Sequence, residues 1–336
     1  MEVRRMKAIE VVTLTKVEGA NLNSNGTEGV ISVLKKVRDP VDGREYVRVS
    51  GQSVKYHLRQ ILKELGWELS QIYPRSEGGQ KVIVSAGEPY KYIDDDLFGY
   101  MIAKKIEGKN ATLRRTSVVR TNGMISIFPY QEDRDFGVRY DPTGDQHNIY
   151  ETEITTNVMR GNYFIELDRL GVFVEGLEVP KLNPGEYSLE VISVKDVTGR
   201  EVTLYVLPRE EREKRLKALL TAIMEYHGGA KLSNFFTKVY PEVMMLVKLK
   251  RKIPVVGDSL RVKEGYIDGK MIIDVERIRE AIETFSDNVE EAYIGLFKSK
   301  FANVDELEGT FENLEKVRIV SMKELRKVIE EISLGE

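Results

Sequence analysis

The sequence contains no cysteine, and this absence excludes several kinds of chemistry. A chain without thiols has no disulfide bonds, no cysteine-ligated zinc and no cysteine nucleophile. Histidines are also scarce, because only His57, His147 and His227 are present and they stand far apart in the chain. None of them can be placed beside a nucleophile, so a hydrolytic triad has no support.

Long apolar runs are missing as well. No stretch reaches the roughly 18 to 20 apolar residues of a membrane span, and the N-terminus does not resemble a signal peptide. We therefore expect a cytoplasmic protein with no membrane partner. The 336 residues, 41% of them hydrophobic, predict a core with large insertions or two domains that share an interface. Abundant Lys and Glu beside few Gln favour a thermophilic source.

The net charge of −3 conceals an uneven distribution along the chain. Residues 1–66 carry 12 Lys and Arg against 8 Asp and Glu, whereas residues 275–336 carry 9 against 15. The first part therefore offers a basic surface, and the last part offers an acidic surface that can face a neighbouring protein. Two such ends suggest head-to-tail contact between copies, although monomers also show imbalances of this size.

Residues 47–62 predict a short strand that leads into a helix capped by Ser50. The following Gly51 leaves backbone N–H groups free at the positive end of the helix, where an anion can bind. At helical spacing an apolar stripe is formed by Val54, Leu58, Ile61, Leu62 and Leu65, and a basic stripe by Lys55, Arg59 and Lys63. A purely structural helix with solvated charges explains the same pattern.

Two polar segments near this helix allow more than one interpretation. Residues 7–17 predict a central strand, apolar on both faces, and the Asn-rich stretch 18–26 that follows predicts a loop with exposed amides or an ordinary turn. The run Asp94-Asp95-Asp96 suggests a metal site. Adjacent carboxylates rarely converge on one ion, so we favour a charge cluster at a helix N-terminus and expect no metal.

Residues 113–128 predict a β-hairpin with a type I′ turn at Asn122-Gly123. In the first strand, Arg114 and Arg120 share a face, so their guanidinium groups can stand over a nucleic-acid backbone or can simply be solvated. The long polar stretch 129–150 follows, with Phe136 and Val138 near its middle. A protruding ribbon there can wedge between bases, and a plain surface loop is the alternative.

The remaining elements complete an α+β pattern. We expect a hairpin over 187–207, a helix that begins after Pro208 and ends at Gly228-Gly229, a buried strand over 243–247, and helices near 275–285 and 322–332. This order permits a ferredoxin-like βαββαβ sheet interrupted by insertions.

Several short motifs occur in an order that resembles one protein family. They are the Asn-rich loop with Asn21 and Asn23, the element V-R-V-S-G-Q-S-V-K-Y-H-L-R of residues 47–59, Leu97-Phe98-Gly99, the R-x-S-x-V pattern of residues 115–119, and Gly228-Gly229. The sequence resembles the Cas-seven (DevR/Csa-type) backbone subunit of the type I CRISPR Cascade complex, in its archaeal I-A branch.

This resemblance implies an RRM-like palm formed by residues 1–66 and 108–252, a finger-like insertion at 67–107, a thumb within 129–150, and a C-terminal region, 253–336, packed on the core. It implies head-to-tail polymerisation along guide RNA, pairing of the guide with target DNA, contacts with Cas-five-type, small and large subunits, and neither catalysis nor a cofactor. The expected RNA-binding residues, from the resemblance and from the residue patterns, are Asn21, Asn23, Ser50, Gln52, Ser53, Lys55, Arg59, Arg114, Arg115, Arg120, Phe136 and Val138.

Two alternatives remain open. Related backbone subunits of type III complexes cleave target RNA with an aspartate in the loop after the first strand, where this chain offers only Glu28. A stand-alone RNA-binding regulator is the second alternative, because the older DevR name suggests one.

Overall fold

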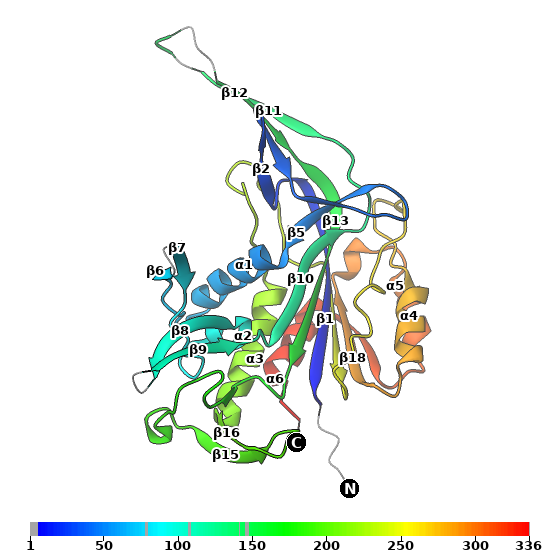
Figure 1. Cartoon of the computed structure of the whole chain (residues 1–336). Coiled ribbons are helices and arrows are strands. Elements are labelled where there is room, and N and C mark those ends of the chain that lie inside the picture. The colour runs from blue at the N-terminus through cyan, green and yellow to red at the C-terminus, as the bar shows by residue number, and fades with distance from the viewer. Residues whose placement is uncertain (1–5, 78–79, 107–108, 141, 145–147, 336) are drawn as a thin grey trace.

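The computed structural model describes residues 6–77, 80–106, 109–140, 142–144 and 148–335. An eight-stranded sheet forms its centre, with helices on both faces (Figure 1). In spatial order its strands are β19 (Val317–Ser321), β18 (Val289–Leu296), β17 (Val243–Leu249), β1 (Ala8–Ala20), β13 (Thr155–Glu166), β10 (Val119–Ser126), β5 (Glu45–Ser50) and β4 (Lys36–Arg38).

Strand β1 is central, antiparallel to both β13 and β17. Its alternate residues enter two different cores, because neighbouring side chains of a strand point to opposite faces. Ile9 and Val11 join a core with the helices α1 (Gly51–Glu64), α3 (Arg209–Met224) and α6 (Met322–Glu331). Val12 and Leu14 join a second core with α4 (Val275–Thr284) and α5 (Val304–Phe311). The predicted central strand, apolar on both faces, is confirmed.

The middle of the sheet has a simple connectivity. Strands β1, β10, β13 and β17 come in this order along the chain. In the sheet they lie side by side in the order β17-β1-β13-β10. Helix α1 lies between β1 and β10 in sequence, and α3 lies between β13 and β17. Both helices pack on the same face of the sheet, in one core. The structure is therefore a mixed α/β fold with one large sheet.

Smaller elements surround this sheet. A four-stranded sheet contains β11 (Arg134–Arg139), β12 (Asn148–Glu153), β3 (Ile31–Leu34) and β2 (Ser24–Glu28), and a three-stranded sheet contains β14 (Val172–Val174), β16 (Glu201–Val206) and β15 (Glu190–Lys195). Two hairpins pair β6 (Tyr73–Glu77) with β7 (Gln80–Val84) and β8 (Tyr100–Ile106) with β9 (Lys109–Arg115), and a short helix, α2 (Ile93–Phe98), lies between them in sequence. The described part of the chain contains no helix long and apolar enough to cross a membrane.

The predicted hairpin over 113–128 is wrong. Asn122-Gly123 is not a turn, because β10 runs through it and shifts register between Thr121 and Gly123. Gly123 adopts φ of +91°, and a Cβ there would stand 1.9 Å from the Val49 carbonyl oxygen. The positive φ of Gly123 therefore belongs to a β-bulge, at the point where β10 closely approaches β5. Arg114 ends in the β8–β9 hairpin and Arg120 in the large sheet, so the two do not share one strand face.

Other predicted boundaries also shift. The stretch 18–26, expected as a loop, is mostly strand, because β1 extends to Ala20 past an irregularity in its pairing and β2 starts at Ser24. The hairpin over 187–207, the strand over 243–247 and the two C-terminal helices are confirmed. The helix after Pro208 is present, but it ends at Met224 with Glu225 as its C-cap and not at Gly228-Gly229.

Asp96 is the centre of a buried ion network that joins three elements. Its side chain on α2 is fully buried and accepts hydrogen bonds from Arg115 Nη2 at 2.5 Å and Arg215 Nη1 at 2.8 Å. Arg115 also binds Glu178 at 2.8 Å. The Asp94–Asp96 run lies in the first turn of α2, so the predicted position at a helix N-terminus is confirmed. All three side chains are buried, and Asp94 and Asp95 accept hydrogen bonds from the backbone N–H groups of Ser70 and Glu88.

Asp96→Asn is expected to lower the free energy of unfolding by about 3 kcal/mol, because two buried guanidinium groups lose the carboxylate that they share. Chemical denaturation measures this change. Glu225→Gln is the matched control: it breaks the exposed ion pair with Arg326, 2.6 Å in length, and should cost less than about 1 kcal/mol. Equal losses in the two variants would contradict a structural role for Asp96.

Candidate functional site

The start of α1 and the loop after β1 form one hydrogen-bonded unit. Ser50 caps α1, because its hydroxyl accepts from Ser53 N at 3.3 Å, and its own N–H donates to Asn23 Oδ1 at 2.9 Å. The predicted cap is confirmed. The Ser53 amide is engaged by this cap and is therefore not free for an anion, whereas the Gln52 side chain is exposed.

The backbone at this junction is too crowded for side chains. A Cβ on Gly51 would lie 2.7 Å from the Thr121 carbonyl oxygen, and Gly123 meets the backbone of Val49 and Ser50. Contacts this close require glycine, so the start of α1 is fixed against β10. The cap therefore presents its polar groups from a rigid base.

The chain after α3 runs along α1 toward the N-terminal end of that helix. His227 Nε2 lies 3.0 Å from Glu64 Oε2 near the end of α1. Gly228 packs on the His57 ring, where an added Cβ would be 2.1 Å from Cγ, and Ala230 N donates to Leu22 O at 2.9 Å. We name the surface built from Asn23, Ser50, Gln52, Tyr56, His57 and residues 228–231 the α1 junction.

Two side chains of the α1 junction were missed by the sequence analysis. Tyr56 is 57% exposed and stands edge-on to His57, with ring centroids 5.1 Å apart. Lys231 Nζ donates to Thr152 Oγ1 at 3.0 Å. The position of Tyr56 on the polar side of a predicted helix was a usable signal, but nothing local indicated that residue 231 returns to α1.

The basic stripe of α1 is mostly occupied by contacts within the chain. Lys55 Nζ donates to Ser117 Oγ at 2.9 Å, and burial, with the nearby charge of Arg59, lowers the pKa of Lys55. Arg59 Nε lies 3.3 Å from Asp94 Oδ2, and its guanidinium stacks on Phe98. Lys63 is exposed. Lys55 and Arg59 therefore have structural partners that periodicity alone did not reveal.

Two predicted RNA-binding residues are buried in the interior. Asn21 is 1% exposed, and its Nδ2 donates to Glu153 O at 2.9 Å. Arg115 belongs to the buried ion network and its side chain has no exposed surface. Neither side chain reaches the surface in this conformation, so we leave both out of the candidate interface. Of the other two predicted arginines, Arg114 is exposed and Arg120 is paired with Glu166 at 3.0 Å.

Strands β11 and β12 form a ribbon that projects from the body (Figure 1). Phe136 and Val138 are 60% and 47% exposed. Val138 pairs with Ile149, which is 51% exposed, so the three apolar side chains lie on one face of the ribbon. Residues 141 and 145–147 of the expected thumb lie outside the described residues. The predicted protruding ribbon is present, and its apolar face stays exposed among the described residues.

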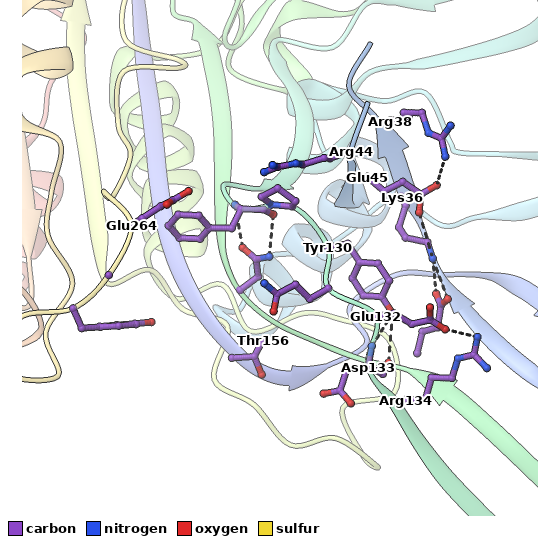
Figure 2. A pocket seen from close by; sticks show the side chains of 17 residues that line it. Lys36, Arg38, Arg44, Glu45, Tyr130, Glu132, Asp133, Arg134, Thr156 and Glu264 are labelled. Carbon is purple, nitrogen blue, oxygen red and sulfur yellow. Dashed lines mark hydrogen bonds and ion pairs between the residues drawn. The ribbon is translucent and has the colours of Figure 1, made fainter. Parts of the chain in front are cut away.

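A cavity of about 1190 Å³ opens at the base of the ribbon (Figure 2). Glu153 holds this base together, because its carboxylate accepts from Leu34 N at 2.8 Å and from Lys36 Nζ at 3.0 Å. Lys36 also stacks on Tyr130, and residues 264–266 of the C-terminal region line the far side. Most of these charges are paired with one another, and the bonds of Glu153 join β12 to β3 and β4 at the ribbon base.

Possible metal ligands do not cluster in the described residues. These residues contain no group of three or more His, Asp or Glu side chains arranged to hold a metal ion. Glu28, the only acid of the loop after the first strand, ends strand β2 and is exposed.

Gly228→Ala should lower the melting temperature, because the new methyl group must displace the His57 ring or the chain at 228. Replacing His57 by Gly in the same protein should restore part of the loss, since it removes the Cβ and Cγ that would lie 2.2 and 2.1 Å from the new methyl group. Thermal unfolding of the two single variants and the double variant measures this coupling. Simple additivity of the two changes would contradict direct packing.

Comparison with known proteins identifies the family and similar folds. The family model of the CRISPR-associated negative auto-regulator DevR/Csa2 matches residues 11–271, whereas the comparison with curated proteins finds no match. A chain titled "CRISPR RNA-guided surveillance complex" shares 13% identity with a TM-score of 0.56, covering 96% of this chain and 98% of that one. A second, "CRISPR RNA-guided surveillance complex, pre-nicking", shares 12% with a TM-score of 0.56, covering 96% and 99%. Because the family model covers most of its length, the chain belongs to the DevR/Csa2 family.

Proposed function

We propose that this protein is a non-catalytic, guide-RNA-binding backbone subunit of a type I CRISPR Cascade complex in the cytoplasm. Copies polymerise head to tail along the guide RNA and present it for pairing with target DNA, beside Cas-five-type, small and large subunits. The observation that carries the proposal is the projecting ribbon with the exposed apolar face formed by Phe136, Val138 and Ile149. A soluble subunit gains from such a face when an assembly buries it.

The fold supports the same function. The spatial order β17-β1-β13-β10, with α1 and α3 on one face, is that of a βαββαβ sheet, and we interpret it as an RRM-like palm. The α1 junction offers polar side chains, a helix N-terminus and the exposed ring of Tyr56. Such groups bind backbone phosphates and stack on bases without reading sequence. Sequence recognition is then left to pairing between guide and target.

Two alternatives have specific tests. The family description as a negative auto-regulator favours a stand-alone RNA-binding regulator, which would bind RNA without forming multimers of one subunit. A type III-like nuclease would cleave RNA at regular intervals with Mg²⁺ and lose that activity in Glu28→Ala. Multimers on intact RNA separate the backbone subunit from both.

Replacing Phe136, Val138 and Ile149 together by Ser should leave the melting temperature of the free protein unchanged, because these side chains are exposed. It should abolish regular multimers on long RNA, which electron microscopy shows directly. Val197→Ser is the matched control, since Val197 is fully exposed on a turn outside the ribbon. Normal multimers of the triple variant would show that assembly does not need the apolar face.

Lys55→Ala should weaken RNA binding about equally for unrelated sequences and lower the salt slope by roughly one unit, as the loss of one phosphate contact does. Arg59→Ala should do the same but also lower stability, because Asp94 is 2% exposed and loses its ion pair. Anisotropy titrations at several salt concentrations measure both variants. Lys214→Ala, which removes an exposed cation of α3, is the control. A loss confined to one RNA sequence would contradict backbone binding.

A further inference from the structure

The face of the large sheet opposite α1 carries an unusual row of side chains. Residues paired across five strands form this row, which runs from β5 to β17 through Arg48, Ile125, Arg160, Leu14 and Val243. Paired residues of neighbouring strands point to the same face. The row is therefore aliphatic at β17 and β1 and carries an arginine at both β13 and β5, on either side of Ile125.

The arginines of this row lie where the sheet is no longer covered by α4 and α5. Leu14 and Val243 are buried in the core beneath α4 and α5. Arg160 and Ile125 lie beyond that core and line a cavity of about 550 Å³, together with Arg38, Tyr46 and Arg261. The turn at residues 39–42 closes the opposite side. We name this space the arginine cavity.

Arg160 and Arg261 have neutral partners instead of carboxylates. Arg160 Nη1 donates to the Asp258 carbonyl oxygen at 3.0 Å, and Arg261 Nη2 donates to the Ile127 carbonyl oxygen at 3.2 Å. Arg160 Nε is buried and has no acceptor. Within the described residues, no carboxylate oxygen lies within 4.0 Å of either guanidinium group. Neither guanidinium group therefore has a carboxylate within ion-pair distance among the described residues.

The acids that line the arginine cavity are already engaged. Asp39 Oδ1 accepts from Val41 N at 2.8 Å, and Asp42 accepts from Arg44 N at 2.8 Å and from the Tyr46 hydroxyl at 2.6 Å. Burial lowers the pKa of Arg160, and the charges of Arg261 and Arg277 act in the same direction, against only Asp258. An anion in the cavity would relieve this repulsion.

We propose that the arginine cavity binds a phosphate group between the guanidinium groups of Arg160 and Arg261. Guanidinium groups suit phosphate, because they donate parallel hydrogen bonds and remain charged. The phosphate is either a phosphodiester of a nucleic-acid strand or a free phosphate ion. This site goes beyond the proposed function, because it lies across the sheet from the α1 junction and does not depend on guide RNA being bound there.

The first experiment uses the RNA-free protein and inorganic phosphate. Phosphate should raise the melting temperature by about 2 °C or more over chloride of the same ionic strength, because a ligand that binds the folded state stabilises it. Arg160→Gln combined with Arg261→Gln should abolish the shift. Arg326→Gln, which removes an arginine paired with Glu225 far from the cavity, should keep it.

A second pair of variants serves in case the arginine variant folds poorly. Val41 is 93% exposed at the rim of the cavity, so Val41→Glu adds a negative charge without disturbing packing. Val197→Glu adds the same charge to an exposed turn elsewhere. The phosphate shift should disappear in Val41→Glu and persist in Val197→Glu. Equal shifts in these two variants would overturn the proposal.

A labelled abasic oligonucleotide, which has phosphodiesters but no bases, identifies the source of the phosphate. If a strand is the ligand, Val41→Glu should bind it about tenfold more weakly than Val197→Glu. Equal affinities together with a cavity-dependent phosphate shift would assign the site to free phosphate. If neither probe distinguishes the two variants, no phosphate site exists there. If the protein does not bind guide RNA, Lys55→Ala will not weaken RNA binding. The phosphate shift in the arginine cavity does not depend on that result.

Discussion

A close approach of two backbones fixes the start of α1, and the candidate interface depends on it. Gly51 meets the Thr121 carbonyl and Gly123 meets the Val49 carbonyl, at separations that leave no room for a Cβ. Asn23 then joins the loop after β1 to the Ser50 cap, and Gly228 packs on His57. Segments distant in sequence therefore present their polar groups on one surface without a flexible loop between them.

The ribbon depends on a different kind of constraint. At its base, Glu153 binds Leu34 N and Lys36 Nζ, and its carbonyl accepts from Asn21 Nδ2. These bonds hold β12 against the strands that follow β1. Farther out, the side chains on one face are apolar and exposed. A stiff base beneath an uncovered apolar face suits a segment that finds its partner in an assembly, because little ordering entropy is lost on docking.

Sequence patterns correctly predicted those elements that are determined by neighbouring residues in the chain. The Ser50 cap follows from a hydroxyl and a glycine at a helix start, and β1 follows from a run of apolar residues on both faces. Asn122-Gly123 misled, because a positive φ serves a bulge as well as a hairpin turn. Arg115 misled for another reason: its partners Asp96 and Glu178 are distant in sequence. The arginine cavity depends on register across several strands, which no local pattern contains.

The RNA that copurifies with the protein from its native cells tests the central claim most directly. A backbone subunit that holds guide RNA should carry RNA of defined length, and sequencing should show spacers flanked by repeat-derived ends. Because binding at the α1 junction is expected to follow the RNA backbone, the spacers should vary freely while the repeat-derived ends stay constant. A broad mixture of cellular transcripts, or a single regulatory RNA, would contradict the guide-RNA role.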